Sequence, residues 1–232
     1  MIVFIGGQHR SGSTFTFNIA RDLLLTVGSV GQASANSLLN YSDVLNNNDH
    51  FLLKSHCLEN AELRMVREGE AKMIMTKRDP LSAIASLMDT FGINRKDAFQ
   101  AFLDWRCMYD CIAEHALVIE YELIETRPDH VTTQIANLLI PEIRSADIVD
   151  ICNRYSKIAV MEMSNKIDRE DSEVIDLGFS YFDRHTFFHR SHVASLTSPD
   201  TEARISAEDI SWIRNALRSN SVVQKAGADT AP

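Results

Sequence analysis

The sequence predicts an α/β fold in which a mostly parallel central sheet is flanked by helices. Short apolar runs recur along the chain without polar alternation, which is typical of strands buried on both faces of a parallel sheet. Segments with helical periodicity separate these runs, and the first run leads into a glycine-rich turn followed by a helix. In such folds, ligands bind beyond the carboxyl ends of the strands.

The expected elements follow one another along the chain. The predicted strands are Ile2–Ile5, Phe51–Leu53, Met73–Met75 and Ala116–Ile119. The predicted helices are Phe15–Val27, a helix from Pro80 to about Phe91, Arg95–His115 and Ala207–Arg218. Gly28 is expected to cap the first helix at its C-terminus, and Asp79 is expected to cap the second at its N-terminus.

The length of 232 residues, with 45% hydrophobic and 24% charged residues, is typical of one globular domain. We expect a single α/β domain over residues 1–218 and a flexible C-terminal tail over residues 219–232. Residues 32–49 and 165–204 look irregular, and both are candidates to cover an acceptor site. Disorder is the alternative for the first of them.

Composition also limits the partners. The net charge of −9 argues against nucleic-acid binding, because domains that bind nucleic acid usually carry a basic stripe. The four cysteines form no CxxC pair and have no histidine at zinc-like spacing, so reduced thiols are expected. No apolar run is long enough to span a membrane, and the chain begins directly in a strand, so we expect a cytoplasmic protein.

The turn after the first predicted strand has the composition of an anion-binding loop. Gly6, Gly7 and Gly12 permit a tight turn with close backbone approach, and Ser13 and Thr14 lie where a helix begins. Free N–H groups and the positive end of the helix dipole would converge there on a phosphate or a sulfate. An ordinary strand–turn–helix junction is the alternative.

The loop differs from that of nucleotide kinases. Their pattern, GxxxxGK[ST], has a lysine that reaches the terminal phosphates of ATP. Here Gly7 and Gly12 are followed directly by Ser13, and the cation lies inside the loop as Arg10. Further polar residues follow two other predicted strands: Lys54 and His56 after the second, and Arg78 after the third. We expect all of these residues to meet at one edge of the sheet.

Four segments, in order, resemble the sulfotransferases that use 3′-phosphoadenosine-5′-phosphosulfate (PAPS). HRSGSTFTFN resembles the 5′-phosphosulfate loop of that family, and Lys54-Ser55-His56 resembles its K-[ST]-H strand end. MIMTKRDPLSAIAS is similar to its 3′-phosphate segment, and ALVIEYELI followed by Pro128 is similar to its YEDL element. The resemblance spans about Ile2 to Leu139, and the RKG-type segment of the cytosolic members has no clear copy here.

The resemblance implies roles for individual residues. His56 would be the general base, Arg10 and Lys54 would stabilise charge on the sulfonate and the bridging oxygen, and Arg78 and Ser86 would hold the 3′-phosphate. Many family members have lysine at the Arg10 position, but an arginine there acts only as a clamp because it does not readily give up a proton. The residues expected to bind PAPS are Arg10, Ser11, Gly12, Ser13, Thr14, Arg78 and Ser86.

The implied reaction transfers a sulfuryl group from PAPS to an acceptor hydroxyl, leaves 3′-phosphoadenosine-5′-phosphate (PAP) and needs no metal. The acceptor would be a small molecule or a glycan, and neither its identity nor the oligomeric state follows from the sequence. A P-loop small-molecule kinase and a non-catalytic nucleotide-binding module are the alternatives. The polar cluster His189, Arg190, Ser191 and His192 is a candidate replacement for the missing C-terminal segment.

Overall fold

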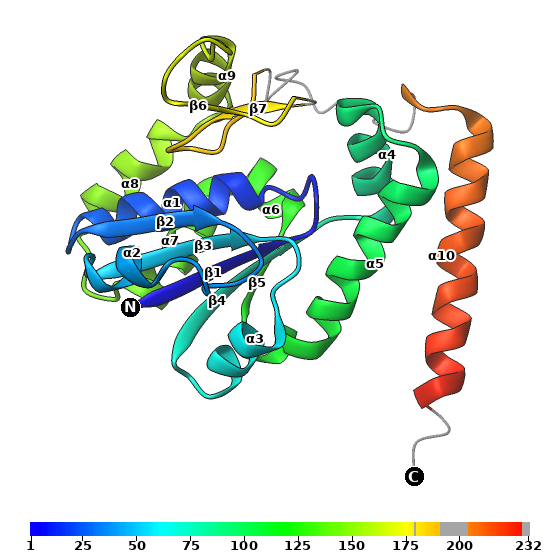
Figure 1. The fold of residues 1–232 in the computed structure, drawn as a ribbon, viewed down its shortest axis with the longest axis horizontal. Helices are drawn as coiled ribbons and strands as arrows, with labels where there is room; N and C mark the ends of the chain where they lie inside the picture. The colour runs from blue at the N-terminus through cyan, green and yellow to red at the C-terminus, as the bar shows by residue number, and fades with distance from the viewer. Residues whose placement is uncertain (179, 191–203, 229–232) are drawn as a thin grey trace.

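The computed structural model describes residues 1–178, 180–190 and 204–228. Its centre is a five-stranded parallel sheet with the order β2-β3-β1-β4-β5 (Figure 1). The strands are β1 (Ile2–Gly7), β2 (Val30–Ser34), β3 (His50–Ser55), β4 (Ala71–Lys77) and β5 (Leu117–Glu120). The predicted α/β fold with a parallel sheet is confirmed.

Helices follow most of the strands. They are α1 (Ser13–Leu25), α2 (Ser42–Asn46), α3 (Asn60–Arg67), α4 (Pro80–Phe91), α5 (Arg95–Ile112), α6 (Tyr121–Thr126), α7 (Pro128–Leu139), α8 (Ser145–Arg154), α9 (Lys157–Asn165) and α10 (Ala207–Ala228), with the 3-10 turn η1 (Ala113–His115). A short antiparallel pair, β6 (Val174–Asp176) and β7 (Tyr181–Asp183), lies between α9 and α10 in the chain.

Two apolar cores lie on opposite faces of the sheet. Val3 and Ile5 pack against α1, α7 and α8, while Phe4 packs against α3, α4 and α5 on the other face. All three side chains are fully buried, because successive residues of a strand point to opposite faces and both faces are covered (Figure 1). This explains why the strand reads as an uninterrupted apolar run.

The structure corrects three boundaries. Residues 32–49 contain the end of β2 and all of α2, not only irregular chain. Helix α1 ends at Leu25, with Thr26 at the C-cap position, so Gly28 is not the predicted cap. Helix α10 continues to Ala228, past its predicted end at Arg218, into residues expected to form a flexible tail.

The β2 strand was missed because it is short and lies at the edge of the sheet. Its buried residues, Gly31 and Ala33, are small, and Gln32 between them is only partly covered. Such a pattern has little apolar periodicity, and the strand is defined by its pairing with β3. Within the described ranges, no helix combines the length and apolar character needed to cross a bilayer.

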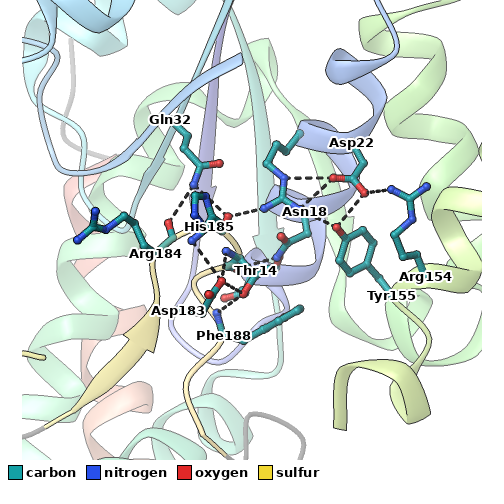
Figure 2. A network of polar contacts seen from close by, with 12 residues as sticks. Thr14, Asn18, Asp22, Gln32, Arg154, Tyr155, Asp183, Arg184, His185 and Phe188 are labelled. Atoms are coloured by element: carbon teal, nitrogen blue, oxygen red, sulfur yellow. Dashed lines mark hydrogen bonds and ion pairs between the residues drawn. The ribbon is translucent and has the colours of Figure 1, made fainter. Parts of the chain in front are cut away.

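A buried carboxylate ties α1 to the end of α8. Asp22 is 6% exposed; its Oδ2 accepts hydrogen bonds from Arg154 at 2.5 Å and from the Tyr155 hydroxyl at 2.9 Å. Its Oδ1 accepts a hydrogen bond from Nε of Arg21 at 3.1 Å. Figure 2 shows Asp22 between Arg154 and Tyr155. A buried carboxylate with this many donors holds its partners in fixed positions.

We predict that Asp22→Ala lowers the free energy of unfolding by about 3 kcal/mol. This value is at the low end for breaking a buried ion pair, because the half-exposed Arg154 side chain can turn toward water once Asp22 is removed. Asp147→Ala is the matched control, since Asp147 also pairs with an arginine, Arg144, but at the surface. Urea unfolding measures both variants. Equal midpoints for the two would show that the Asp22 network does not stabilise the fold.

Candidate functional site

The loop between β1 and α1 is tied to β4 through its interior. The N–H of Gln8 donates to the Thr76 carbonyl at 3.0 Å, and Oε1 of Gln8 accepts from the N–H of Arg78 at 2.8 Å. A Cβ at Gly7 would lie 2.2 Å from the Cβ of Ser13, so the loop closes only with glycine there. Sequence reasoning found the glycines, but not the role of Gln8.

Ser11 is fully buried and stabilises this loop from inside. Its hydroxyl lies 2.5 Å from the Gln8 carbonyl and 2.7 Å from Oγ1 of Thr76, and its N–H donates to the same Gln8 carbonyl at 3.2 Å. The hydrogen bonds predicted to go from Ser11 to a bound anion are therefore made within the protein. Ser11 therefore holds the loop together from inside.

Helix α1 presents free donors at its N-terminus. Gly12 lies at the N-cap position with φ of 87°, and no side chain caps the helix. The first intrahelical hydrogen bond runs from Thr16 to the Gly12 carbonyl, so the N–H groups of Ser13, Thr14 and Phe15 have no acceptor among the described residues. No acidic residue lies in the first turn. This end of α1 therefore suits an anion, as predicted for Gly12, Ser13 and Thr14.

His56 follows β3 and has a defined tautomer. Its Nδ1 lies 2.5 Å from the Gly7 carbonyl, an atom that can only accept, so Nδ1 carries the proton and Nε2 keeps its lone pair. Burial, followed by the nearby His9 and Lys54, holds the pKa of His56 well below its usual value. At neutral pH this imidazole is uncharged and ready to accept a proton.

Lys54 also lies at the end of β3. Burial, together with the charge of Arg10, lowers the pKa of Lys54 to about 8, so the ammonium is still charged at neutral pH. Its Nζ lies 5.9 Å from the ring centroid of Phe187. No carboxylate among the described residues is within ion-pair distance of Lys54.

Arg10 points from the loop toward α4. Its backbone is left-handed, with φ of 63°. Its Nε donates to Oγ of Ser86 at 3.2 Å, and its Nη1 donates to Nε2 of His189 at 3.1 Å. The structure thus brings Arg10 and Ser86 together, although the sequence assigned them to different ends of the donor.

Arg78 follows β4 and braces the same loop. Its Nη1 donates to the Arg10 carbonyl at 3.2 Å, and its guanidinium carbon lies 4.2 Å from the ring centroid of Tyr121. Burial raises the pKa of Tyr121 to about 12, so the ring stays neutral beneath the cation. Sequence reasoning left Tyr121 aside, because an aromatic residue after a buried strand is usually part of the core.

A segment from the second irregular region covers these cations. Asn18 donates to the Thr186 carbonyl at 2.8 Å, and Gln32 donates to the carbonyls of Arg184 and His185 (Figure 2). These contacts fix residues 183–190 across α1 and β2, so that Phe187 reaches Lys54 and His189 reaches Arg10. In the predicted polar cluster, His189 lies at the site, and Ser191 and His192 fall outside the described residues.

His9 is a site residue that the sequence analysis did not single out. Its ring stacks on that of His56, with 3.7 Å between centroids and 19° between planes. Both rings border a cavity of about 350 Å³. The cavity is lined by His9, Ser34, Ala35, Asn36, Lys54, Ser55, His56, Cys57, Ala101 and Asp104.

The site as a whole gathers positive charge. Among the described residues, no carboxylate lies within ion-pair distance of Arg10, Lys54 or Arg78. The uncapped N-terminus of α1 follows Arg10 in the chain and adds further donors. Even partly buried cations are costly without anionic partners, so the arrangement suits a ligand with more than one negative charge. Among the described side chains, no three from His, Cys, Asp and Glu are placed to bind a metal ion.

No family model and no curated protein matches this sequence. Solved structures match the fold. The mouse sulfotransferase SULT7A1, complexed with PAP, is similar with a TM-score of 0.60 and 14% identity, over 90% of this chain and 79% of that chain. Retinol dehydratase in a complex with retinol and PAP has a TM-score of 0.61 and 13% identity, over 94% of this chain and 80% of that chain.

A second complex of retinol dehydratase, with androsterone and the inactive cofactor PAP, gives a TM-score of 0.59 and 12% identity, over 94% of this chain and 80% of that chain. At these identities the likeness shows the fold. The chain therefore has the sulfotransferase fold, as its short motifs predicted.

We predict that Gly12→Ala reduces anion binding and stability more than Gly92→Ala. Both glycines have positive φ, 87° and 65°, so both variants pay the cost of a left-handed alanine, about 1 kcal/mol. Only at Gly12 would the new Cβ also meet a neighbour, Cδ1 of Ile124, at 2.5 Å. Thermal unfolding with and without sulfate measures both effects. An equal sulfate-induced shift in the two variants would contradict an anion site at Gly12.

Proposed function

We propose that this protein is a PAPS-dependent sulfotransferase that moves a sulfuryl group from PAPS to an acceptor hydroxyl. The observation that carries the proposal is a cluster at the carboxyl ends of β1, β3 and β4. It contains a neutral imidazole together with cations and helical N–H groups that have no anionic partner among the described residues. The similarity of the fold to proteins solved with PAP supports it. The sequence motifs point the same way.

The donor would be held at two places. The N–H groups of Ser13 and Thr14, with Lys54, would bind the 5′-phosphosulfate, because these donors have no anionic partner in the part of the chain that the structure describes. Arg78 and Ser86 would bind the 3′-phosphate, with Tyr121 supporting the guanidinium from behind. Arg10 contacts Ser86 and interacts electrostatically with Lys54, so it would serve between the two anions.

PAPS would supply an activated sulfuryl group, which passes to the acceptor oxygen as the bond to the phosphate oxygen breaks. His56 would take the acceptor's hydroxyl proton on Nε2, the nitrogen that the Gly7 contact leaves unprotonated. The Gly7 carbonyl keeps accepting from Nδ1–H and so stabilises the imidazolium that forms. Lys54 and Arg10 would offset the negative charge that develops on the transferred group and the leaving phosphate.

The two alternative functions differ from the proposed one: a kinase would use a different donor, and a non-catalytic module would carry out no reaction. A P-loop kinase would need a cation for the terminal phosphates and magnesium between them, and the loop has no lysine at the expected position. A non-catalytic module would keep the binding site without turnover. The acceptor would be a small molecule or a glycan with a free hydroxyl, and no metal would be required.

The donor assignment predicts that PAP raises the melting temperature of the protein more than ATP does at equal concentration. Arg78→Met should reduce the shift from PAP strongly, but should change the shift from adenosine 5′-phosphosulfate much less, because that compound lacks the 3′-phosphate. Arg127→Met is the control, since Arg127 is exposed and pairs with Asp129. A larger shift with ATP and magnesium than with PAP would favour the kinase.

The base assignment predicts that His56→Ala lowers the rate of sulfuryl transfer about 10²- to 10⁴-fold while leaving PAP binding nearly unchanged. Radiolabelled PAPS with a panel of phenols, alcohols, sugars and glycans identifies an acceptor for the measurement. His130→Ala is the control, because His130 is an exposed histidine on α7. An unchanged rate in His56→Ala would remove His56 as the base.

A further inference from the structure

In the loop between β1 and α1, neighbouring side chains point in different directions, and His9 lies between two of them. Gln8 is fixed to β4 through Thr76 and Arg78, and Arg10 turns toward α4. His9, between them, faces the end of β3 and stacks on His56. Its Nδ1 is buried without a hydrogen-bond partner among the described residues, so no polar contact explains the placement of the ring.

His56 is therefore constrained in two independent ways. The hydrogen bond from Nδ1 to the Gly7 carbonyl acts in the plane of the ring, and the stacking contact with His9 acts on its face. A hydrogen bond alone leaves an imidazole free to tilt about the bond, whereas a ring stacked at 3.7 Å prevents that tilt. The two contacts together fix both the tautomer and the orientation of the ring.

We propose that His9 is a positioning residue for His56: its ring holds the His56 imidazole in one plane and covers one face of it, so that Nε2 stays oriented toward the neighbouring cavity. The proposal concerns the geometry of the free protein, and its catalytic meaning rests on the proposed function of His56 as base. His9 acts through His56 and needs no contact with the donor or the acceptor.

The charges around the pair are compatible with this role. The groups that face it are Lys54 from β3, Arg10 from the loop and Asp104 from α5, together with the Gly7 carbonyl. Burial, then Lys54 and Arg10, lowers the pKa of His9 to about 4, so His9 is neutral at pH 7. His9 helps to lower the pKa of His56, but because it is neutral at pH 7 it places no like charge against an imidazolium that forms on His56. A phenyl ring would do the same without titrating.

The test uses two variants of the full chain, His9→Phe and His9→Ala, and needs no acceptor. Nitrogen-15 NMR titration of the histidine side chains reports the pKa and the tautomer of His56, with His56→Gln giving the assignment. His9→Phe should keep the Nδ1–H tautomer and the lowered pKa. In His9→Ala, water reaches one face of His56, so its pKa should rise toward the usual value for histidine and both tautomers should appear.

Thermal unfolding of the same variants detects a general loss of structure. If His9→Ala unfolds, His9→Phe still tests the proposal. A folded His9→Phe variant in which His56 no longer has a single tautomer would overturn it. The same tautomer and pKa of His56 in His9→Ala as in the wild type would overturn it as well.

Turnover of radiolabelled PAPS then separates this proposal from the proposed function. In His9→Ala, sulfuryl transfer should fall about 10-fold to 100-fold through kcat, with the acid limb of the pH profile moved to higher pH, and His9→Phe should restore most of the rate. Normal rates and an unshifted pH profile in His9→Ala would contradict the positioning role. A wild-type protein that neither binds PAP nor uses PAPS would refute the sulfotransferase assignment, while the NMR result would still decide whether His9 positions His56.

Discussion

The site depends on the hydrogen bonds that tie the β1–α1 loop to Thr76 of β4. Gln8 and Ser11 use their polar groups on Thr76 and on each other, inside the loop. These bonds fix the path of the loop, and with it the places of the N–H groups at the start of α1, the ring of His9 and the guanidinium of Arg10. A loop with a different set of interior hydrogen bonds would not hold these donors in the same places. Backbone geometry therefore places the N–H groups that would form the proposed anion site.

The sequence predicted the parts of the fold that depend on local pattern and strand register. In the sheet, Gly6 pairs with Ser55 and Gly7 pairs with Thr76, so the residues that follow β3 and β4 must lie beside the loop. This is why the position of Lys54, His56 and Arg78 beside the loop could be predicted from their place after apolar runs. His9 and Tyr121 were not found, because their roles arise from contacts with His56 and Arg78 that no spacing encodes. The burial of the Ser11 side chain was not predicted either, because a buried and an exposed hydroxyl look alike in a sequence.

The site is positively charged, although the chain as a whole is negatively charged. The protein carries a net charge of −9, yet Arg10, Lys54 and Arg78 lie at one sheet edge without carboxylate partners among the described residues. The lowered pKa of Lys54 shows the cost of this arrangement: burial and Arg10 both disfavour the charged ammonium. A bound dianion would relieve that cost. An anionic ligand would therefore be attracted by the local placement of these cations, because the net charge of −9 opposes its approach at long range.

Helix α1 connects the anion site to the rest of the molecule. Its N-terminus offers the free N–H groups, while Asn18 and Asp22, one turn apart, lie further along it. Asn18 holds the carbonyl of Thr186 in the covering segment, and Asp22 holds Arg154 and Tyr155 at the end of α8 (Figure 2). The segment that brings Phe187 to Lys54 and His189 to Arg10 is thus fixed to the same helix that would bind the anion. A shift of α1 would strain both attachments, so the hydrogen bonds of Asn18 and Asp22 couple the N-terminus of α1 to the segment that covers the site.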